Sequence, residues 1–124
     1  MKLVYVAGPY RGPSTWQIDR NISAAREWGM LVAMCGAYPV IPHSNTAHFD
    51  GTLDDRFWLE GTLELLSRCD GSIFIPGWIR STGSRGEWTL AERMGIPALD
   101  LEEVDLGSSI KILTGWISGL GARK

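Results

Sequence analysis

The chain lacks any run of eighteen apolar residues, although 44% of its 124 residues are hydrophobic. A helix that crosses a bilayer needs about twenty such residues in succession, so we expect no membrane-spanning segment. An apolar leader with a cleavage site is also missing, because Met1 and Lys2 lead directly into an apolar strand pattern. These absences predict a cytoplasmic protein that does not bind membranes.

Cysteine and histidine are scarce. Cys35 and Cys69 are far apart and form no C-x-x-C motif, which favours reduced, buried thiols over a disulfide. His43 and His48 have no cysteine beside them, and their spacing is not that of a zinc site. We therefore expect neither a metal nor another cofactor.

An excess of positive charge is missing as well, because 12 basic residues face 14 acidic residues and the formal net charge is -2. Nucleic acids and anionic membrane surfaces attract proteins with a positive field, so we expect the chain to bind neither. A small anionic ligand held by one or two arginines is compatible with this balance.

Two familiar phosphate-binding motifs, G-x-x-x-x-G-K-[ST] and G-x-G-x-x-G, do not occur. The first loop instead reads GPYRGPSTW over residues 8–16. Gly8 and Gly12 let the backbone approach a ligand, and Arg11 supplies a planar cation that suits a phosphate or a sugar. The alternative is a glycine–proline turn with a solvated arginine.

Short apolar runs alternate with segments whose apolar residues recur every three or four positions, which indicates alternating strands and helices. We expect one domain over residues 1–124, built as a small doubly wound, Rossmann- or flavodoxin-like α/β fold. Its parallel sheet would have four to five strands in the order 2-1-3-4, with helices on both faces. The predicted strands cover residues 3–7, 38–41, 72–75 and 97–99. The predicted helices cover residues 18–35, about 52–69, 85–94 and 110–120.

Ligands of such folds bind at the carboxyl ends of the strands, where the strand order reverses. That rim would consist of residues 8–15, 42–50 and 76–87. The third segment contains Ser81, Thr82, Gly83 and Ser84 just before a helix. Backbone N–H groups at a helix N-terminus attract anions, and hydroxyl groups add further donors.

Glu87 follows this hydroxyl-rich turn and has two interpretations. In the first turn of the helix, the helix dipole would favour an ionised carboxylate that could act as a nucleophile. Alternatively, Ser84 and Glu87 form an S-x-x-E capping box, in which Glu87 only accepts from a backbone N–H group. Trp78 and Trp88 beside it are expected to pack in the core or at the rim rather than to stack on a nucleobase.

Taken together, these segments resemble the nucleoside 2-deoxyribosyltransferase superfamily over roughly residues 3–101. The nearest groups are the hydrolases of deoxynucleoside 5′-monophosphates and an uncharacterised branch found in bacteria and bacteriophages. The resemblance rests on the order of several short matches rather than on any one of them. They are G-x-x-R-G at Gly8–Gly12, Val40-Ile41-Pro42-His43, Cys69-Asp70 before an apolar strand, S-x-G-x-x-x-E at Ser81–Glu87, and Gly95-Ile96-Pro97.

The resemblance implies roles for the matched positions. Glu87 corresponds to a nucleophile that attacks the anomeric carbon of the sugar and displaces the base, as in retaining glycosidases. Arg11 and Ser81 correspond to positions that contact the phosphate, and Gly83 lets its loop lie against the ligand. His43 corresponds to a rim position near the sugar or the base.

Three departures from the family pattern concern the reaction. Thr62 stands where the hydrolases carry a second carboxylate, and Asp54 or Asp55, with Asp50 as a weaker candidate, would have to replace it. The C-terminal GLGARK offers no equivalent of the carboxylate and tyrosine that a neighbouring subunit supplies in the transferases. Tyr10 occupies a position that is usually small or apolar in the family.

The sequence therefore predicts an N-glycosidase that acts on a nucleoside or deoxynucleoside 5′-monophosphate, or the related base-exchange transferase. A non-catalytic module that binds or senses a nucleotide is the alternative. The ligand is in each case a small nucleotide or nucleoside. Because members of the superfamily self-associate, the resemblance also implies a homo-oligomer, for which the apolar stripe of the last helix could serve.

Overall fold

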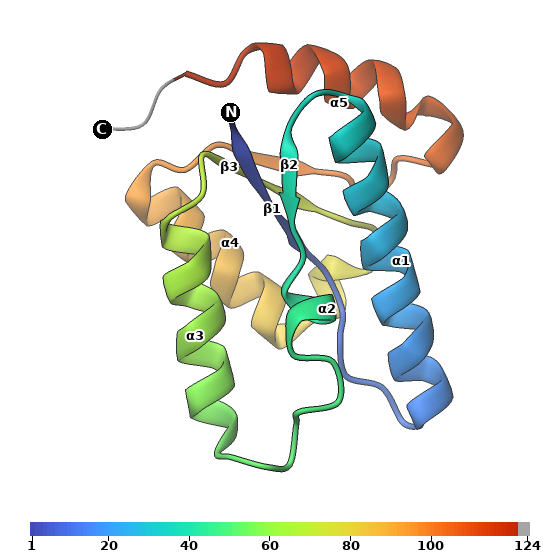
Figure 1. Cartoon of the computed structure of the whole chain (residues 1–124), viewed down its shortest axis with the longest axis vertical. Coiled ribbons are helices and arrows are strands. Elements are labelled where there is room, and N and C mark those ends of the chain that lie inside the picture. The colour runs from blue at the N-terminus through green and yellow to red at the C-terminus, as the bar shows by residue number, and fades with distance from the viewer. Residues whose placement is uncertain (122–124) are drawn as a thin grey trace.

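The computed structural model describes residues 1–121 of the chain (Figure 1). In this range the sheet has four parallel strands in the order β2-β1-β3-β4, which confirms the predicted fold class and strand order. The order reverses between β1 and β3, so the loops after these two strands diverge over the carboxyl edge of the sheet. The strands are β1 Leu3–Ala7, β2 Tyr38–Val40, β3 Gly71–Phe74 and β4 Ala98–Asp100.

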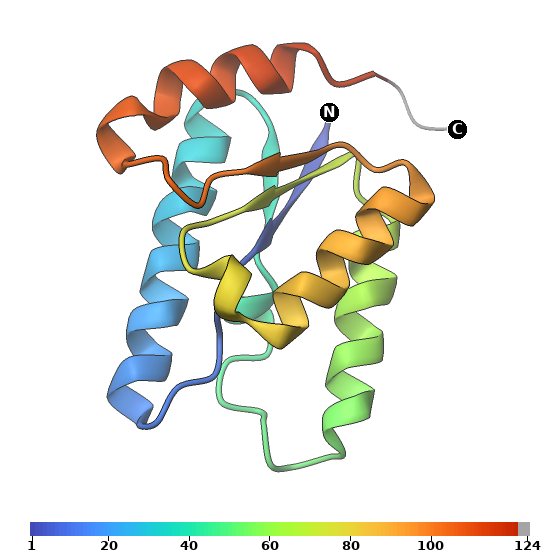
Figure 2. The same ribbon diagram turned by 180° about the vertical axis from the view of Figure 1, so that it is seen from behind.

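Helices cover both faces of the sheet, as Figures 1 and 2 show from opposite sides. Helices α1 and α5 pack on one face, and α3 and α4 pack on the other. Among the described residues, none of these helices combines the length and the apolar character needed to cross a bilayer. The helices are α1 Thr15–Met34, α2 Pro42–Asn45, α3 Asp55–Ser67, α4 Thr82–Met94 and α5 Ser109–Ser118. Two short 3-10 helices are η1 Trp78–Arg80 and η2 Leu106–Ser108.

The core is divided by the sheet because successive side chains of a strand point to opposite faces. Val4 and Val6 of β1 join the cluster under α1 and α5, whereas Tyr5 and Ala7 join the cluster under α3 and α4. Each fully buried aliphatic or aromatic side chain contributes about 1.5–3 kcal/mol relative to its exposed state. The ring of Tyr5 is part of the second core cluster, and its hydroxyl group reaches Glu87 of α4.

The ends of helix α1 follow the expected local chemistry, whereas helix α2 departs from the sequence prediction. Helix α1 begins at the cap Ser14, whose Oγ accepts from Gln17 N at 3.2 Å, and it is followed by Gly36 at φ +101°. Helix α2 lies in residues 42–50, for which the sequence predicts a loop at the rim of the sheet. Proline also fits the first position of a helix, where its missing N–H group costs nothing.

The last helix packs into the first core cluster. Leu113 is completely buried there, and Trp116 and Ile117 are partly buried against the same cluster, while Ile110 keeps 45% of its surface exposed. The apolar stripe of α5 thus serves the core of one chain. The expected self-association remains a prediction, which size-exclusion chromatography would test.

Candidate functional site

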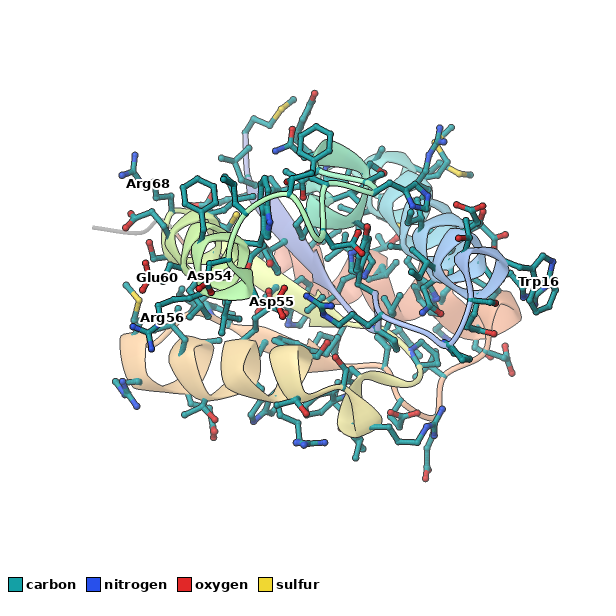
Figure 3. The ribbon with its side chains drawn as sticks, turned by 90° about the horizontal axis from the view of Figure 1, so that it is seen from below. Trp16, Asp54, Asp55, Arg56, Glu60 and Arg68 are labelled. Atoms are coloured by element: carbon teal, nitrogen blue, oxygen red, sulfur yellow. The ribbon has the colours of Figure 1, made fainter. Side chains whose placement is uncertain are left out.

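A cleft of about 910 Å³ opens at the carboxyl edge of the sheet. Its walls come from the loops after β1 and β3, from α2, and from the first turns of α3 and α4. Figure 3 views the molecule from this side, with Asp55 turned toward the middle of the molecule and Trp16 projecting outward. The structure brings nine predicted site residues together in this cleft: Gly8, Tyr10, Arg11, Gly12, His43, Ser81, Gly83, Ser84 and Glu87.

Glu87 lies on the floor of the cleft and is only 7% exposed. The hydroxyl group of Tyr5 donates a hydrogen bond to Glu87 Oε2 from the central strand. Burial raises the pKa of Glu87 from its ordinary value of 4.5 to about 7, and the hydrogen bond from Tyr5 offsets part of that rise. At neutral pH the carboxyl group is therefore near the midpoint of its titration.

Tyr5 itself stays protonated over the whole physiological range. Its pKa is raised well above 10, first by burial and then by the charge of Glu87 beside it. The Thr62 hydroxyl group, which hydrogen-bonds the Tyr5 side chain, acts in the opposite direction. Tyr5 is consequently a permanent donor to the carboxyl group.

The capping-box interpretation of Glu87 is wrong. Helix α4 begins at Thr82, and its cap is Ser81, whose Oγ accepts from Ser84 N at 3.2 Å. Glu87 therefore lies in the second turn of the helix, beyond the first turn in which it was expected. The expected lowering of its pKa by the helix dipole is also wrong, because desolvation dominates and acts in the opposite direction.

His43 lines the cleft and is buried, with 6% of its surface exposed. Its Nε2 contacts the carbonyl oxygens of Gly8 at 3.1 Å and of Pro9 at 3.0 Å. Carbonyl oxygens only accept hydrogen bonds, so Nε2 carries the proton and Nδ1 is the acceptor of the neutral ring. Burial lowers the pKa of His43, which keeps the ring neutral at pH 7.

The glycines of the first loop serve close packing within the protein. A Cβ on Gly8 would lie 2.4 Å from Cγ1 of Ile75, and a Cβ on Gly12 would lie 2.5 Å from Cγ of Gln17. Both glycines also line the cleft, and their close approach to a ligand stays a prediction. Gly83 differs, because no atom lies within 4 Å of the place where its Cβ would stand.

Tyr10 braces the cleft wall. Its hydroxyl group donates to Asp50 Oδ1 at 2.9 Å and accepts from His48 N at 2.7 Å. The amide of Asn21 holds the same loop from α1 by donating to the carbonyl oxygen of Tyr10 at 3.0 Å. Asp50 is thereby paired with a phenol, which makes it a structural partner of the loop.

Arg11 and Asp55 face each other across the mouth of the cleft. Arg11 Nη2 lies 2.7 Å from Asp55 Oδ1, and both side chains are more than half exposed. Asp54, in contrast, does not line the cleft. It caps α3 by accepting from Arg56 N at 2.8 Å. Of the three proposed replacements for the missing carboxylate, Asp50 and Asp55 line the cleft, and Asp50 is already paired with Tyr10.

The turn that carries η1 is fixed from outside the cleft. Glu102 accepts from Gly77 N at 2.8 Å through Oε2 and from Ile79 N at 3.2 Å through Oε1. Trp78 donates from Nε1 to Asp100 Oδ1 at 2.8 Å, and its ring stacks on Trp88 with centroids 4.8 Å apart. Neither tryptophan lines the cleft, so the packing role predicted for both is confirmed.

Several cleft residues were not singled out from the sequence. Arg56 and Arg80 add positive charge to the walls, and Trp58 contributes an aromatic surface. Three buried side-chain atoms have no hydrogen-bond partner within residues 1–121, namely His43 Nδ1, Trp58 Nε1 and Ser84 Oγ, and all three residues line the cleft. Unpartnered buried polar atoms are rare in native proteins and call for an explanation.

Three remaining features are the absence of a metal-binding cluster among the described residues, the two cysteines and the C-terminal segment. Within residues 1–121, no three histidine, cysteine, aspartate or glutamate side chains come together as they would around a metal ion. Cys35 and Cys69 are not joined in a disulfide bond. The segment GLGARK was expected to lack the transferase residues, and its residues 122–124 lie outside the described part of the chain.

The chain belongs to a family defined by a domain of unknown function, DUF7768, whose model matches residues 2–100. No curated protein matches the chain. The description of the family names no reaction, so the resemblance to the nucleoside 2-deoxyribosyltransferase superfamily stays a prediction.

Proposed function

We propose that this member of the DUF7768 family is an N-glycosidase that hydrolyses a nucleoside 5′-monophosphate, with Glu87 as the nucleophile. The observation that carries the proposal is the Glu87 carboxyl group, which is buried, accepts a hydrogen bond from Tyr5 and lies on the floor of a cleft. A buried carboxyl group with a strongly shifted pKa in a cleft is a common mark of an active site.

In the proposed reaction, one oxygen of the Glu87 carboxylate attacks C1′ of the sugar. A bond forms between this oxygen and C1′, and the bond from C1′ to the base nitrogen breaks, so that its electron pair leaves with the base. The departing base takes up a proton. Water then attacks C1′ of the glycosyl ester, loses a proton, and releases the sugar phosphate and the free carboxylate.

Tyr5 has a positioning role in this scheme. Its hydroxyl group donates to Oε2, which fixes the orientation of the carboxylate and leaves Oε1 to approach C1′. The same hydrogen bond lowers the pKa of Glu87 from the higher value that burial alone would produce. A larger fraction of the nucleophile is therefore ionised at neutral pH than without Tyr5.

The phosphate would bind between the start of α4 and the arginines of the cleft. Gly83 leaves open space at the first turn of α4, where helix N–H groups favour an anion. Arg11 and Arg80 line the cleft on the two loops that flank this turn. A phosphate that takes Arg11 as its partner would displace Asp55 from this ion pair.

A non-catalytic nucleotide-binding module is the second candidate. It is favoured by Thr62 at the position of the second carboxylate and by the ion pair that occupies Asp55. A base-exchange transferase shares the first half of the proposed reaction and differs only in its acceptor.

The proposal is tested by chromatographic detection of free base after incubation with each ribonucleoside and deoxyribonucleoside 5′-monophosphate. We expect base release by the parent protein and a loss on the order of a thousandfold or more in Glu87→Gln. The control is Glu92→Gln, which removes an exposed carboxylate of the same helix. An acceptor base added to the same reaction reveals a transferase. Nucleotide binding without base release would refute the reaction and leave the binding module.

A further inference from the structure

The hydroxyl group of Ser84 is the most unusual polar group of the cleft. Ser84 is 1% exposed and lines the cleft, and its Oγ has no partner within residues 1–121. A serine or threonine inside a helix ordinarily bonds the carbonyl oxygen one turn earlier. Thr89, five residues further along the same helix, does so, because its Oγ1 donates to Arg85 O at 3.1 Å. Ser84 Oγ thus lacks the hydrogen bond to the preceding turn that Thr89 makes on the same helix.

A buried hydroxyl group without a partner destabilises a protein unless another molecule satisfies it. Three unpartnered atoms face this requirement, and their chemistry differs. The Nδ1 atom of His43 only accepts, the Nε1–H group of Trp58 only donates, and the hydroxyl group of Ser84 does both. A sugar hydroxyl group also donates and accepts, so Ser84 is the group of the three that matches it in both directions.

The location of Ser84 relative to Glu87 limits which sugar hydroxyl it can meet. The two residues are three positions apart on α4, so their side chains are neighbours on one face of the helix, with Cβ atoms about 5–6 Å apart. Both side chains are buried and both line the cleft. A group bonded to Ser84 therefore lies beside the carbon atom that Glu87 attacks.

The stereochemistry of a nucleotide then selects the group. A carboxylate that displaces the base must approach C1′ from the face of the sugar opposite to the base. The 2′- and 3′-hydroxyl groups of a ribonucleotide lie on that same face, and the 2′-hydroxyl stands on the carbon next to C1′.

We propose that Ser84 hydrogen-bonds the 2′-hydroxyl group of the bound nucleotide, so that the substrates are ribonucleoside rather than deoxyribonucleoside 5′-monophosphates. This inference rests on the proposed function, which brings C1′ against Glu87. It names the sugar, which the function alone leaves open. In a site for deoxyribose, an apolar side chain at position 84 would avoid the unpartnered hydroxyl group.

The test compares the binding affinity of each ribonucleoside 5′-monophosphate with that of the corresponding 2′-deoxyribonucleoside 5′-monophosphate by isothermal titration calorimetry. The proteins carry Glu87→Gln, so that the ligand is not consumed, with either Ser84, Ser84→Ala or Thr89→Ala. We expect the Ser84 form to bind the ribonucleotide about fivefold to tenfold more tightly than the deoxyribonucleotide. Ser84→Ala should weaken ribonucleotide binding alone and so remove the preference. Thr89→Ala, which removes an exposed hydroxyl group outside the cleft, should keep it.

Other outcomes overturn the inference. The inference fails if Ser84→Ala weakens the binding of the ribonucleotide and of the deoxyribonucleotide equally, or weakens neither. It also fails if the deoxyribonucleotide binds more tightly to the Ser84 form, or if no nucleotide binds. Base release, measured separately with Glu87 in place, distinguishes this failure from that of the reaction. If base is released but the preference for ribose or deoxyribose does not depend on Ser84, only the inference is refuted. If the preference depends on Ser84 but no base is released, only the hydrolysis is refuted.

Discussion

Replacing Glu87 with glutamine should change how the stability of the protein depends on pH. The pKa of Glu87 is about 7 in the folded protein, against an ordinary value of 4.5. Since the folded state holds the proton more tightly than the unfolded state, stability falls as the pH rises between these two values. The contribution of the protonated carboxyl group is complete below about pH 4.5 and is lost as the pH rises through about 7.

The size of this effect follows from the two pKa values. One pH unit of difference corresponds to about 1.4 kcal/mol, so the interval from 4.5 to about 7 corresponds to about 3 kcal/mol. Glutamine is close to glutamate in shape, is neutral at every pH and can still accept from Tyr5. The Glu87→Gln variant should therefore lack this part of the pH dependence.

Urea unfolding followed by tryptophan fluorescence would measure the effect between pH 4 and pH 8.5. We expect the free energy of unfolding of Glu87→Gln, relative to the parent, to increase by about 3 kcal/mol from the acid to the alkaline end. The same comparison with Glu92→Gln should stay flat, because Glu92 is exposed. A flat difference for Glu87→Gln would show that its carboxyl group is solvated, and the argument from burial would be refuted.

Three further predictions concern Tyr5 and the ion pair between Arg11 and Asp55. Tyr5→Phe removes the hydrogen bond that lowers the pKa of Glu87, so the rising limb of a pH profile of base release should move to higher pH. An unmoved limb would contradict the positioning role of Tyr5. Asp55→Asn breaks an exposed ion pair, so the free energy of unfolding in urea should change by less than about 1 kcal/mol. Arg11→Ala should weaken the binding of nucleoside monophosphates but not of nucleosides, while Asp55→Asn should keep monophosphate binding. Equal losses in both variants would argue against phosphate as the partner of Arg11.

The sheet could be predicted from the sequence because its strands are short apolar runs separated by helical patterns. Buried parallel strands are apolar on both faces, and this makes runs such as Leu3–Ala7 visible without knowledge of their neighbours. Right-handed crossovers then limit the strand orders that are possible, and the order 2-1-3-4 is one of them. The start of α4 could not be predicted in the same way, because Ser81 and Ser84 are both good caps. The choice of Ser81 depends on the burial of Ser84 and Glu87 in the folded chain.

The candidate site was predictable as a set of loops but not as a set of contacts. Residues at the carboxyl ends of parallel strands meet at one edge, so Gly8, His43 and Ser81 could be grouped from the sequence alone. Tyr5 could not be added, because its place in an apolar strand indicates only a core residue. The bond from its hydroxyl group to Glu87 joins residues 82 positions apart and depends on the packing of α4 on the sheet.

The pairing of Arg11 with Asp55 was hidden for a similar reason. Each residue alone suggested contact with a ligand, and their meeting depends on the positions of two loops 44 residues apart in sequence. The sequence does carry a signal for it, because unlike charges at one rim of a sheet tend to pair. The partner of Arg11 cannot be identified from this signal without the positions of the rim segments in the folded chain.

Glu102 makes one wall of the cleft depend on a segment that lies beyond the matched family region. Its carboxylate clamps the turn at Gly77 and Ile79, and helix α5 further along the chain completes a core cluster with Leu113. A fragment cut at residue 100 would keep Glu87, Tyr5 and every matched position but would lose both supports. The segment that the family model matches is therefore shorter than the segment that supports the cleft wall and the core. Sequence changes after residue 100 can reshape this wall of the cleft while Tyr5 and Glu87 on its floor stay the same.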